Sequence, residues 1–274
     1  MGSGMKSRGP ITAAALALLL ALPVGAAAQG ATARSQEARS QDLLDTAESL
    51  EGNYLAAIVA GAGRDLGAAA VYLREAIKGD PQNNDLLERA FVAFLADGAM
   101  PDAFRAADKL IQRDPSNGLA QLAIGIRALK QKNYQTARNH LQRGGRGRAA
   151  DITATLLSAW SQLGSGQPTR AIETLERLKG EASYNLFRDY HAGLILDAAG
   201  RKADAEKRLK AAYDSEKTTL RLVDLWARMQ ARNGDFDGAA ATYSEFDRLL
   251  PNHPIVRDGL AKVAARQTPP RQVG

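Results

Sequence analysis

The chain contains no cysteine. This absence excludes disulfides, thiol catalysis, iron–sulfur clusters and thiolate zinc sites. Only three histidines are present, His140, His191 and His253, and they are scattered, so a histidine-rich metal centre is not expected. The sequence also lacks a glycine-rich phosphate loop, a GxSxG or HExxH motif and an acidic calcium loop. We therefore expect a protein that is not an enzyme and that uses neither a cofactor nor a metal.

Aromatic residues are scarce as well, at 5% of the 274 residues, whereas alanine occupies 52 positions. Alanine is the strongest helix former, and its small side chain lets two helices approach closely. With 45% hydrophobic and 24% charged residues, the chain can form a sizeable core and does not have the composition of a disordered protein. The composition predicts an all-helical protein.

The first 29 residues show the order of features that is typical of an export signal. Lys6 and Arg8 precede an almost unbroken apolar run, Ile11–Leu22, and three small alanines follow it. We predict a signal peptide over residues 1–29 and a periplasmic or secreted mature protein. The alternatives are an N-terminal core helix and an uncleaved anchor, which would be the chain's only contact with a membrane. The polar residues 30–49 are predicted to be a flexible lead-in.

A repeat with a fixed length of 34 residues occupies most of the remaining chain. Two Asp-Pro pairs, at 80–81 and 114–115, are 34 residues apart, and stepping by this distance gives six windows without a gap. The windows are 50–83, 84–117, 118–151, 152–185, 186–219 and 220–253. Their twentieth position is always alanine: Ala69, Ala103, Ala137, Ala171, Ala205 and Ala239.

Three further positions of the window predict its local structure. Position eight is small in every window except the second, which has Phe91 there. Position fifteen is glycine in four windows, where a positive φ would end a helix. Proline at position thirty-two, in Pro81, Pro115 and Pro251, stops the next helix. Each window is therefore predicted to be a hairpin of two helices that cross most closely at positions eight and twenty.

This pattern resembles the tetratricopeptide repeat family, whose units share the small eighth position, the alanine at twenty, a bulky residue at twenty-four and the proline at thirty-two. The sequence departs from the family at position four, which is often Trp there, and at position twenty-seven, which is alanine only in Ala76 and Ala212. The resemblance covers residues 50–253. It implies an all-α, right-handed α-solenoid of six helix-turn-helix repeats, in which the first helix of each hairpin lines a concave face.

The last repeat of such a stack needs a cap, because no neighbour covers its apolar side. Residues 254–266 are predicted to form this capping helix, so the solenoid spans 50–266. A truncated seventh repeat is the alternative for this end. The remaining residues, 267–274, are predicted to be a disordered tail.

The resemblance also implies where function resides, since positions two, five, nine, twelve and thirteen form the concave face in this family. Here these positions are acidic at the start of the array (Glu51, Asp85 and Glu88), apolar and aromatic in the middle, and rich in arginine at the end. An apolar groove with aromatic anchors and charged ends suits a peptide ligand. The candidate peptide-binding residues are Tyr54, Ile58, Val92, Leu122, Ile126, Trp160, Phe187, Tyr190, Leu194, Arg221, Arg228 and Arg232. The alternative is that the apolar members pack between helices and that the arginines form a solvated helix face.

The sequence thus predicts a non-catalytic scaffold for protein–protein interaction, exported to the cell envelope, that binds a peptide or partner segment in its concave groove. The alternative is a self-associating or docking subunit of an envelope enzyme or assembly complex. The family's charged clamp for a peptide carboxylate is not supported, because Tyr54 and Ile58 stand at the matching positions. A short Arg/Gly run at 143–148 is interpreted as a linker, since the net charge of +6 is modest, and no nucleic-acid partner is expected.

Overall fold

The computed structural model describes residues 48–145, 148–179 and 182–271. Within these ranges the chain forms thirteen α-helices and no strand. They are α2 (Leu50–Ala62), α3 (Leu66–Gly79), α4 (Asn84–Asp97), α5 (Met100–Arg113), α6 (Gly118–Lys130), α7 (Tyr134–Gly144), α8 (Arg148–Gly164), α9 (Pro168–Leu175), α10 (Ala182–Ala198), α11 (Lys202–Ser215), α12 (Leu220–Arg232), α13 (Phe236–Leu249) and α14 (Pro254–Ala264). None of these helices combines the length and the apolar character needed to cross a membrane. The predicted signal peptide, 1–29, and residues 30–47 of the lead-in lie outside the described residues.

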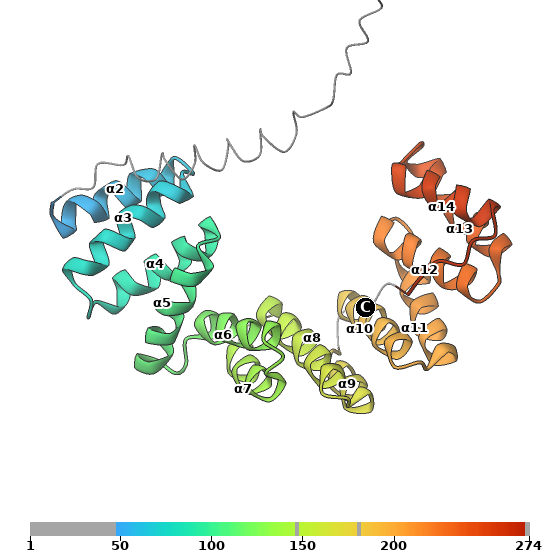
Figure 1. The fold of residues 1–274 in the computed structure, drawn as a ribbon, viewed down its shortest axis with the longest axis horizontal. Helices are drawn as coiled ribbons and strands as arrows, with labels where there is room; N and C mark the ends of the chain where they lie inside the picture. Colours follow the sequence, from blue (N-terminus) through green and yellow to red (C-terminus); the bar gives the residue numbers. More distant parts are fainter. Residues whose placement is uncertain (1–47, 146–147, 180–181, 272–274) are drawn as a thin grey trace, which may run out of the picture.

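The helices follow one another along an open arc, with α2 and α14 at its two tips (Figure 1). From α4 to α12, the first helix of each hairpin lies on the inner side of the arc and the second on the outer side (Figure 1). The prediction of an all-α solenoid of helical hairpins is confirmed. The inner side is the concave face of the sequence analysis.

The helix boundaries follow the 34-residue windows, with one deviation. α2, α4, α6 and α12 begin at the first residue of their windows, but α8 and α10 begin four residues earlier and have 17 residues each. The windows before these two helices have no proline at position thirty-two, where Pro81 and Pro115 stand in the first two windows. No proline therefore prevents α8 and α10 from starting early. Window five lacks the proline too, but there the Glu216 carboxylate accepts a hydrogen bond from the Thr218 N–H (2.8 Å) and holds a turn before α12.

Position fifteen ends the first helix of every hairpin in the left-handed conformation. Four hairpins have glycine there, with φ between 74° and 88°, and the other two have Arg64 (φ 61°) and Lys132 (φ 60°). The N–H groups of Lys132 and of the next residue, Asn133, donate to the carbonyls of Leu129 (2.9 Å) and Ala128 (2.8 Å) at the end of α6. The glycines at position fifteen therefore indicate a left-handed backbone conformation. Arg64 and Lys132 adopt the same conformation, although it is strained for a residue with a Cβ.

Replacement of Lys132 by glycine is predicted to stabilise the protein. The free energy of unfolding should rise by about 1 kcal/mol, because the left-handed conformation costs a residue with a Cβ roughly that much. Lys132→Ala, which keeps the Cβ, should leave the free energy of unfolding nearly unchanged.

Gly166→Ala is the reverse test and should lower the free energy of unfolding by about 1 kcal/mol. No atom lies within 4 Å of a Cβ added at Gly166, so only the positive φ disfavours the alanine. Urea titrations of the four proteins measure these values, and equal stability of Lys132→Gly and Lys132→Ala would contradict the assignment.

The two helices of a hairpin meet where position eight faces position twenty-four. A Cβ added to Gly193 would lie 2.4 Å from the side chain of Leu209, and one added to Gly125 would lie 2.9 Å from Leu141. The second hairpin reverses the sizes: Phe91, at position eight, and Ala107, at position twenty-four, are buried in the same cluster. Because the combined volume of the two side chains is limited, a large residue on one helix requires a small one on the other.

Neighbouring hairpins are joined by apolar packing and by partly buried polar contacts. The ring of Tyr213 in α11 stacks on Trp226 in α12, with 6.3 Å between the ring centres. At the end of the stack, Val256 and Val263 of α14 are buried, and a Cβ added to Gly259 would lie 2.4 Å from the Tyr243 ring of α13. α14 therefore covers the last hairpin as a cap.

Candidate functional site on the concave face

The family resemblance places position nine of each repeat on the concave face, and we call its side chains the stripe. Ile58, Val92 and Ile126 are 46%, 47% and 36% exposed in the first three hairpins. In the fourth and fifth hairpins, Trp160 is partly buried and Leu194 is only 8% exposed. The stripe is thus open to solvent in the N-terminal half of the array and closed in the middle.

The open part of the stripe borders a groove of about 650 Å³ between α2, α3 and α4, which we call the N-terminal groove. Ile58 lines it from α2, Val92 lines it from α4, and α3 contributes Leu66, Ala69 and Leu73. The full lining is Ala57, Ile58, Gly61, Leu66, Ala69, Leu73, Asp85, Glu88, Arg89, Val92, Ala93 and Ala96. The groove exposes large apolar side chains, an arrangement typical of protein-binding surfaces.

The charged side chains of the N-terminal groove come from one helix, α4. Asp85 and Glu88 are exposed, and the Glu88 carboxylate accepts a hydrogen bond from Asn117 Nδ2 (3.2 Å). The guanidinium of Arg89 lies over the ring of Tyr54, 5.8 Å from its centre. Two carboxylates and one guanidinium leave the groove with a negative charge, which favours a ligand that carries a basic residue beside its apolar side chains.

Trp160, Tyr190 and His191 form a partly buried aromatic cluster in the middle of the array. Trp160 Nε1, in α8, donates a hydrogen bond to His191 Nδ1 (3.0 Å), in α10, and the ring of Tyr190 meets the His191 ring edge-on, with 5.0 Å between ring centres. Of the expected aromatic anchors, Phe187 remains 42% exposed. Through the hydrogen bond to His191, Trp160 connects the fourth hairpin to the fifth, and Tyr190 packs beside this contact.

Two apolar candidates from the sequence are covered to different degrees. Leu194 is buried in the core cluster that contains Val223 and Leu225 of the next hairpin. Leu122 is partly buried against the cluster that contains Leu141. Leu194 is thereby corrected from a groove residue to a core residue, because the helix of the following repeat covers it.

The three arginines of the sixth hairpin have separate environments. Arg221 is exposed, whereas Arg232 forms an ion pair of 2.8 Å with Asp197 of the preceding hairpin, with the two side chains 13% and 6% exposed. Arg228 is partly buried and donates to a backbone carbonyl of the C-terminal segment. The sequence did offer one signal for the Arg232 pair, since Asp197 stands on the concave face one repeat earlier.

Burial and, to a smaller extent, the positive charge of Arg221 together lower the pKa of His191 to about 4. The indole N–H of Trp160 can only donate, so Nδ1 of the neutral imidazole is the acceptor. A proton on Nδ1 would abolish this hydrogen bond. The contact between the fourth and fifth hairpins therefore depends on a neutral His191.

Stability is predicted to fall when the pH drops from about 6.5 to about 4. In this window the unfolded chain binds a proton at His191, whose ordinary pKa is about 6.5, while the folded chain does not. His191→Gln, which keeps an acceptor for Trp160, should lose about 2 kcal/mol less between pH 7 and pH 4.5 than the unchanged protein. Urea denaturation at the two pH values measures the difference, and parallel losses in both proteins would refute the assignment.

The part of the chain that the structure describes holds no group of three or more His, Asp or Glu side chains arranged to bind a metal ion. Position four, where the tetratricopeptide repeat family often has Trp, is buried in four hairpins (Asn53, Leu87, Gln121 and Val223) and partly buried in the other two (Thr155 and Asp189). Gln121, for example, is 1% exposed, donates to the Pro115 carbonyl (2.8 Å) and hydrogen-bonds His140 (2.7 Å). Its polar atoms are satisfied, so this departure from the family pattern is compatible with the packing.

No family model matches the sequence, and neither does any curated protein. Solved structures do match. PilW, described as a widely conserved type IV pilus biogenesis factor, has a TM-score of 0.58 and 15% identity over 78% of this chain and 100% of its own. A tetratricopeptide repeat protein from Parabacteroides merdae has a TM-score of 0.54 and 14% identity over 87% of this chain and 94% of its own. PilF of Pseudomonas aeruginosa has a TM-score of 0.51 and 18% identity over 81% and 99%.

The chain has the tetratricopeptide repeat fold. At these identities the similarity concerns the fold, and the site must be argued from the residues of this chain. Among the apolar candidates for the concave face, Ile58, Val92 and Ile126 are exposed in the first three hairpins, and Phe187 is exposed in the fifth.

Proposed function

We propose that the protein is a non-catalytic scaffold that binds a segment of another protein in the N-terminal groove. The observation that carries this proposal is the exposure of Ile58 and Val92 on the two sides of one groove of about 650 Å³. Covering large apolar side chains that are exposed to water is favourable, so a partner that buries them gains binding free energy. The inner side of a helical solenoid is an extended surface on which such a segment can lie.

The chemistry of the groove specifies the ligand. Asp85 and Glu88 stand beside the apolar lining, so the ligand carries apolar side chains and at least one lysine or arginine. The apolar contacts supply most of the affinity, whereas the exposed carboxylates speed association and orient the segment.

Val92→Asp is predicted to weaken partner binding at least about tenfold, because it places a carboxylate among apolar contacts and next to two existing acidic residues. The matched control is Val59→Asp, at an exposed valine (72%) that does not line the groove. Both variants, checked by circular dichroism, are used to capture proteins from an envelope extract. Partners that are lost with Val92→Asp and kept with Val59→Asp support the proposal, and equal capture by the two variants opposes it.

We also propose that the scaffold acts outside the cytoplasm. The support comes from residues 1–29, in which Lys6 and Arg8, an apolar run and small alanines occur in the order that an export signal requires. Absence of cysteine is compatible with an oxidising compartment.

Expression of the full chain in a bacterial host is predicted to yield a shortened protein in the periplasmic fraction. Its first residue, read by mass spectrometry of the intact protein, should lie close to Gln29, because the small residues of Ala26–Ala28 suit a signal peptidase. A control chain with Leu18→Arg and Leu19→Arg in the apolar run should remain full-length. An unprocessed wild-type chain in the cytoplasmic fraction would overturn the export proposal.

A further inference from the structure

The chain reverses direction directly after the last helix, α14. Arg266 adopts a positive φ of 49°, and the N–H groups of Arg266 and Gln267 donate to the carbonyls of Val263 and Lys262, each at 2.9 Å. The Arg266 guanidinium lies over the ring of Phe236, 5.6 Å from its centre. This helix-ending turn and the cation–π contact direct the following residues back across α12. Residues 267–271, part of the tail expected to be disordered, therefore have a defined place, and 272–274 lie outside the described residues.

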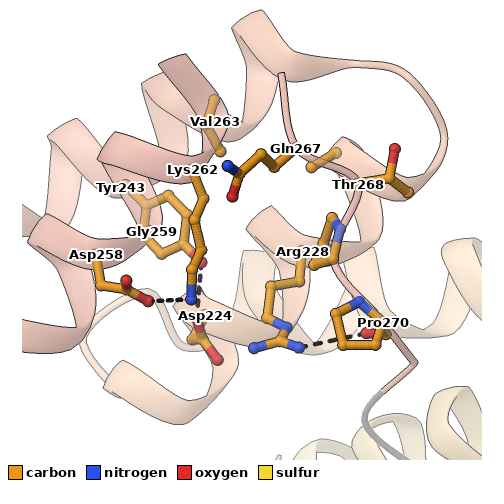
Figure 2. Close-up of a pocket in the computed structure, with 12 residues that line it drawn as sticks. Asp224, Arg228, Tyr243, Asp258, Gly259, Lys262, Val263, Gln267, Thr268 and Pro270 are labelled. Atoms are coloured by element: carbon orange, nitrogen blue, oxygen red, sulfur yellow. Dashed lines mark hydrogen bonds and ion pairs between the residues drawn. The ribbon is translucent and has the colours of Figure 1, made fainter. Parts of the chain in front are cut away.

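Residues 267–270 close a small pocket of about 130 Å³ on the sixth hairpin, which we call the C-terminal pocket (Figure 2). α12 contributes Asp224, Arg228 and Ala231, α13 contributes Tyr243, and α14 contributes Asp258, Gly259, Lys262 and Val263. Arg228 Nη2 donates a hydrogen bond to the carbonyl oxygen of Pro270 (3.3 Å; Figure 2). Arg228 and Ala231 occupy positions nine and twelve of their window. The segment thus contacts position nine of the sixth hairpin, the repeat position at which Ile58 is exposed in the first hairpin.

The charged groups of the C-terminal pocket are largely engaged with one another. Asp224 accepts a hydrogen bond from the Tyr243 hydroxyl (2.7 Å), and Lys262 pairs with Asp258 (2.6 Å). Within the described residues, the buried Nε of Arg228 has no hydrogen-bond partner. Two carboxylates and two cations balance, so the pocket does not select a charged ligand. Its recognition group is the Arg228 guanidinium, which can hold a backbone carbonyl.

The segment that lies over the pocket has a suitable chemistry for this role. Two consecutive prolines, Pro269 and Pro270, restrict the backbone to extended conformations and leave no N–H groups to satisfy. A segment that is already stiff loses little conformational entropy when it docks. The exposed Thr268 and the partly buried Pro269 show that the segment lies along the surface.

We propose that the sixth hairpin carries a second recognition site, for an extended segment of another protein with two consecutive prolines, and that residues 267–270 occupy this site as an internal ligand by lying over the C-terminal pocket. A partner segment binds by displacing residues 267–270 and offering its own carbonyl to Arg228. This inference goes beyond the proposed function and does not depend on the N-terminal groove.

The test uses a synthetic peptide with the sequence QTPPR, that of residues 267–271, as the probe. It is titrated into the full-length mature chain and into the same chain with Pro269→Gly and Pro270→Gly, which releases the internal ligand. Amide and arginine Nε–H signals in ¹⁵N-correlated NMR spectra report binding at Arg228 and Gly259. The released chain should bind the peptide at least about tenfold more tightly, because an internal ligand that fills the site most of the time competes at a millimolar effective concentration.

Two controls make the result specific. In the released chain, Arg228→Ala should abolish peptide binding, whereas Arg257→Ala, at an exposed arginine of α14 outside the pocket, should leave it unchanged. The peptide QTGGR should not bind. Equal affinity for the released and the unchanged chain would overturn the internal ligand, and absence of binding to the released chain at millimolar peptide would overturn the recognition site.

Discussion

The geometry of the whole arc depends on one contact, the approach of position eight in the first helix of each hairpin to position twenty-four in the second. At Gly193 and Leu209 this contact leaves no space for even one added methyl group. The distance between the two helices is therefore set by the combined size of two side chains. The pairs Gly125–Leu141 and Phe91–Ala107 show the same limit in two other hairpins. From α4 to α12, the first helices of the hairpins form the inner row of the arc (Figure 1).

The function that we propose follows from where this stacking leaves apolar residues uncovered. The family resemblance places position nine on the concave face, but the environment of this position changes along the array. Ile58 and Val92 remain open, whereas Leu194 is covered by the next repeat, and Arg228 is covered by the chain's own C-terminal segment. The same repeat position thus lines an open groove in the first two hairpins, packs in the interior in the fifth, and borders a pocket covered by the C-terminal segment in the sixth.

The hairpins were predictable from the sequence because their determinants are local. The glycines at position fifteen correctly predict where the first helices end. The alanines at position twenty are all buried, but the close contact of position eight is with position twenty-four and not with position twenty. Even Phe91, the one large residue at position eight, has its explanation in Ala107, sixteen residues later. The early starts of α8 and α10 are also local, since proline is missing before both.

The exposure of the concave residues was not predictable in the same way, because it depends on the neighbouring repeat. Nothing at Leu194 itself indicates that Val223 and Leu225 bury it, and the Arg232–Asp197 pair forms between two hairpins. The place of residues 267–270 depends on a non-glycine residue, Arg266, adopting a positive φ, which a sequence pattern does not predict. Repeat periodicity therefore gives the fold and the inner face, and contacts between repeats decide which part of that face is free.

A double-mutant cycle between Gly193 and Leu209 measures the central contact most directly. Gly193→Ala should destabilise the protein in the presence of Leu209, because the new methyl group overlaps its side chain, and should be neutral or stabilising in the Leu209→Ala background, where alanine only improves helix propensity. The account predicts a coupling free energy of at least about 1 kcal/mol from urea denaturation of the four proteins. Additive effects of the two substitutions would show that positions eight and twenty-four do not set the spacing of the helices, and would contradict the account.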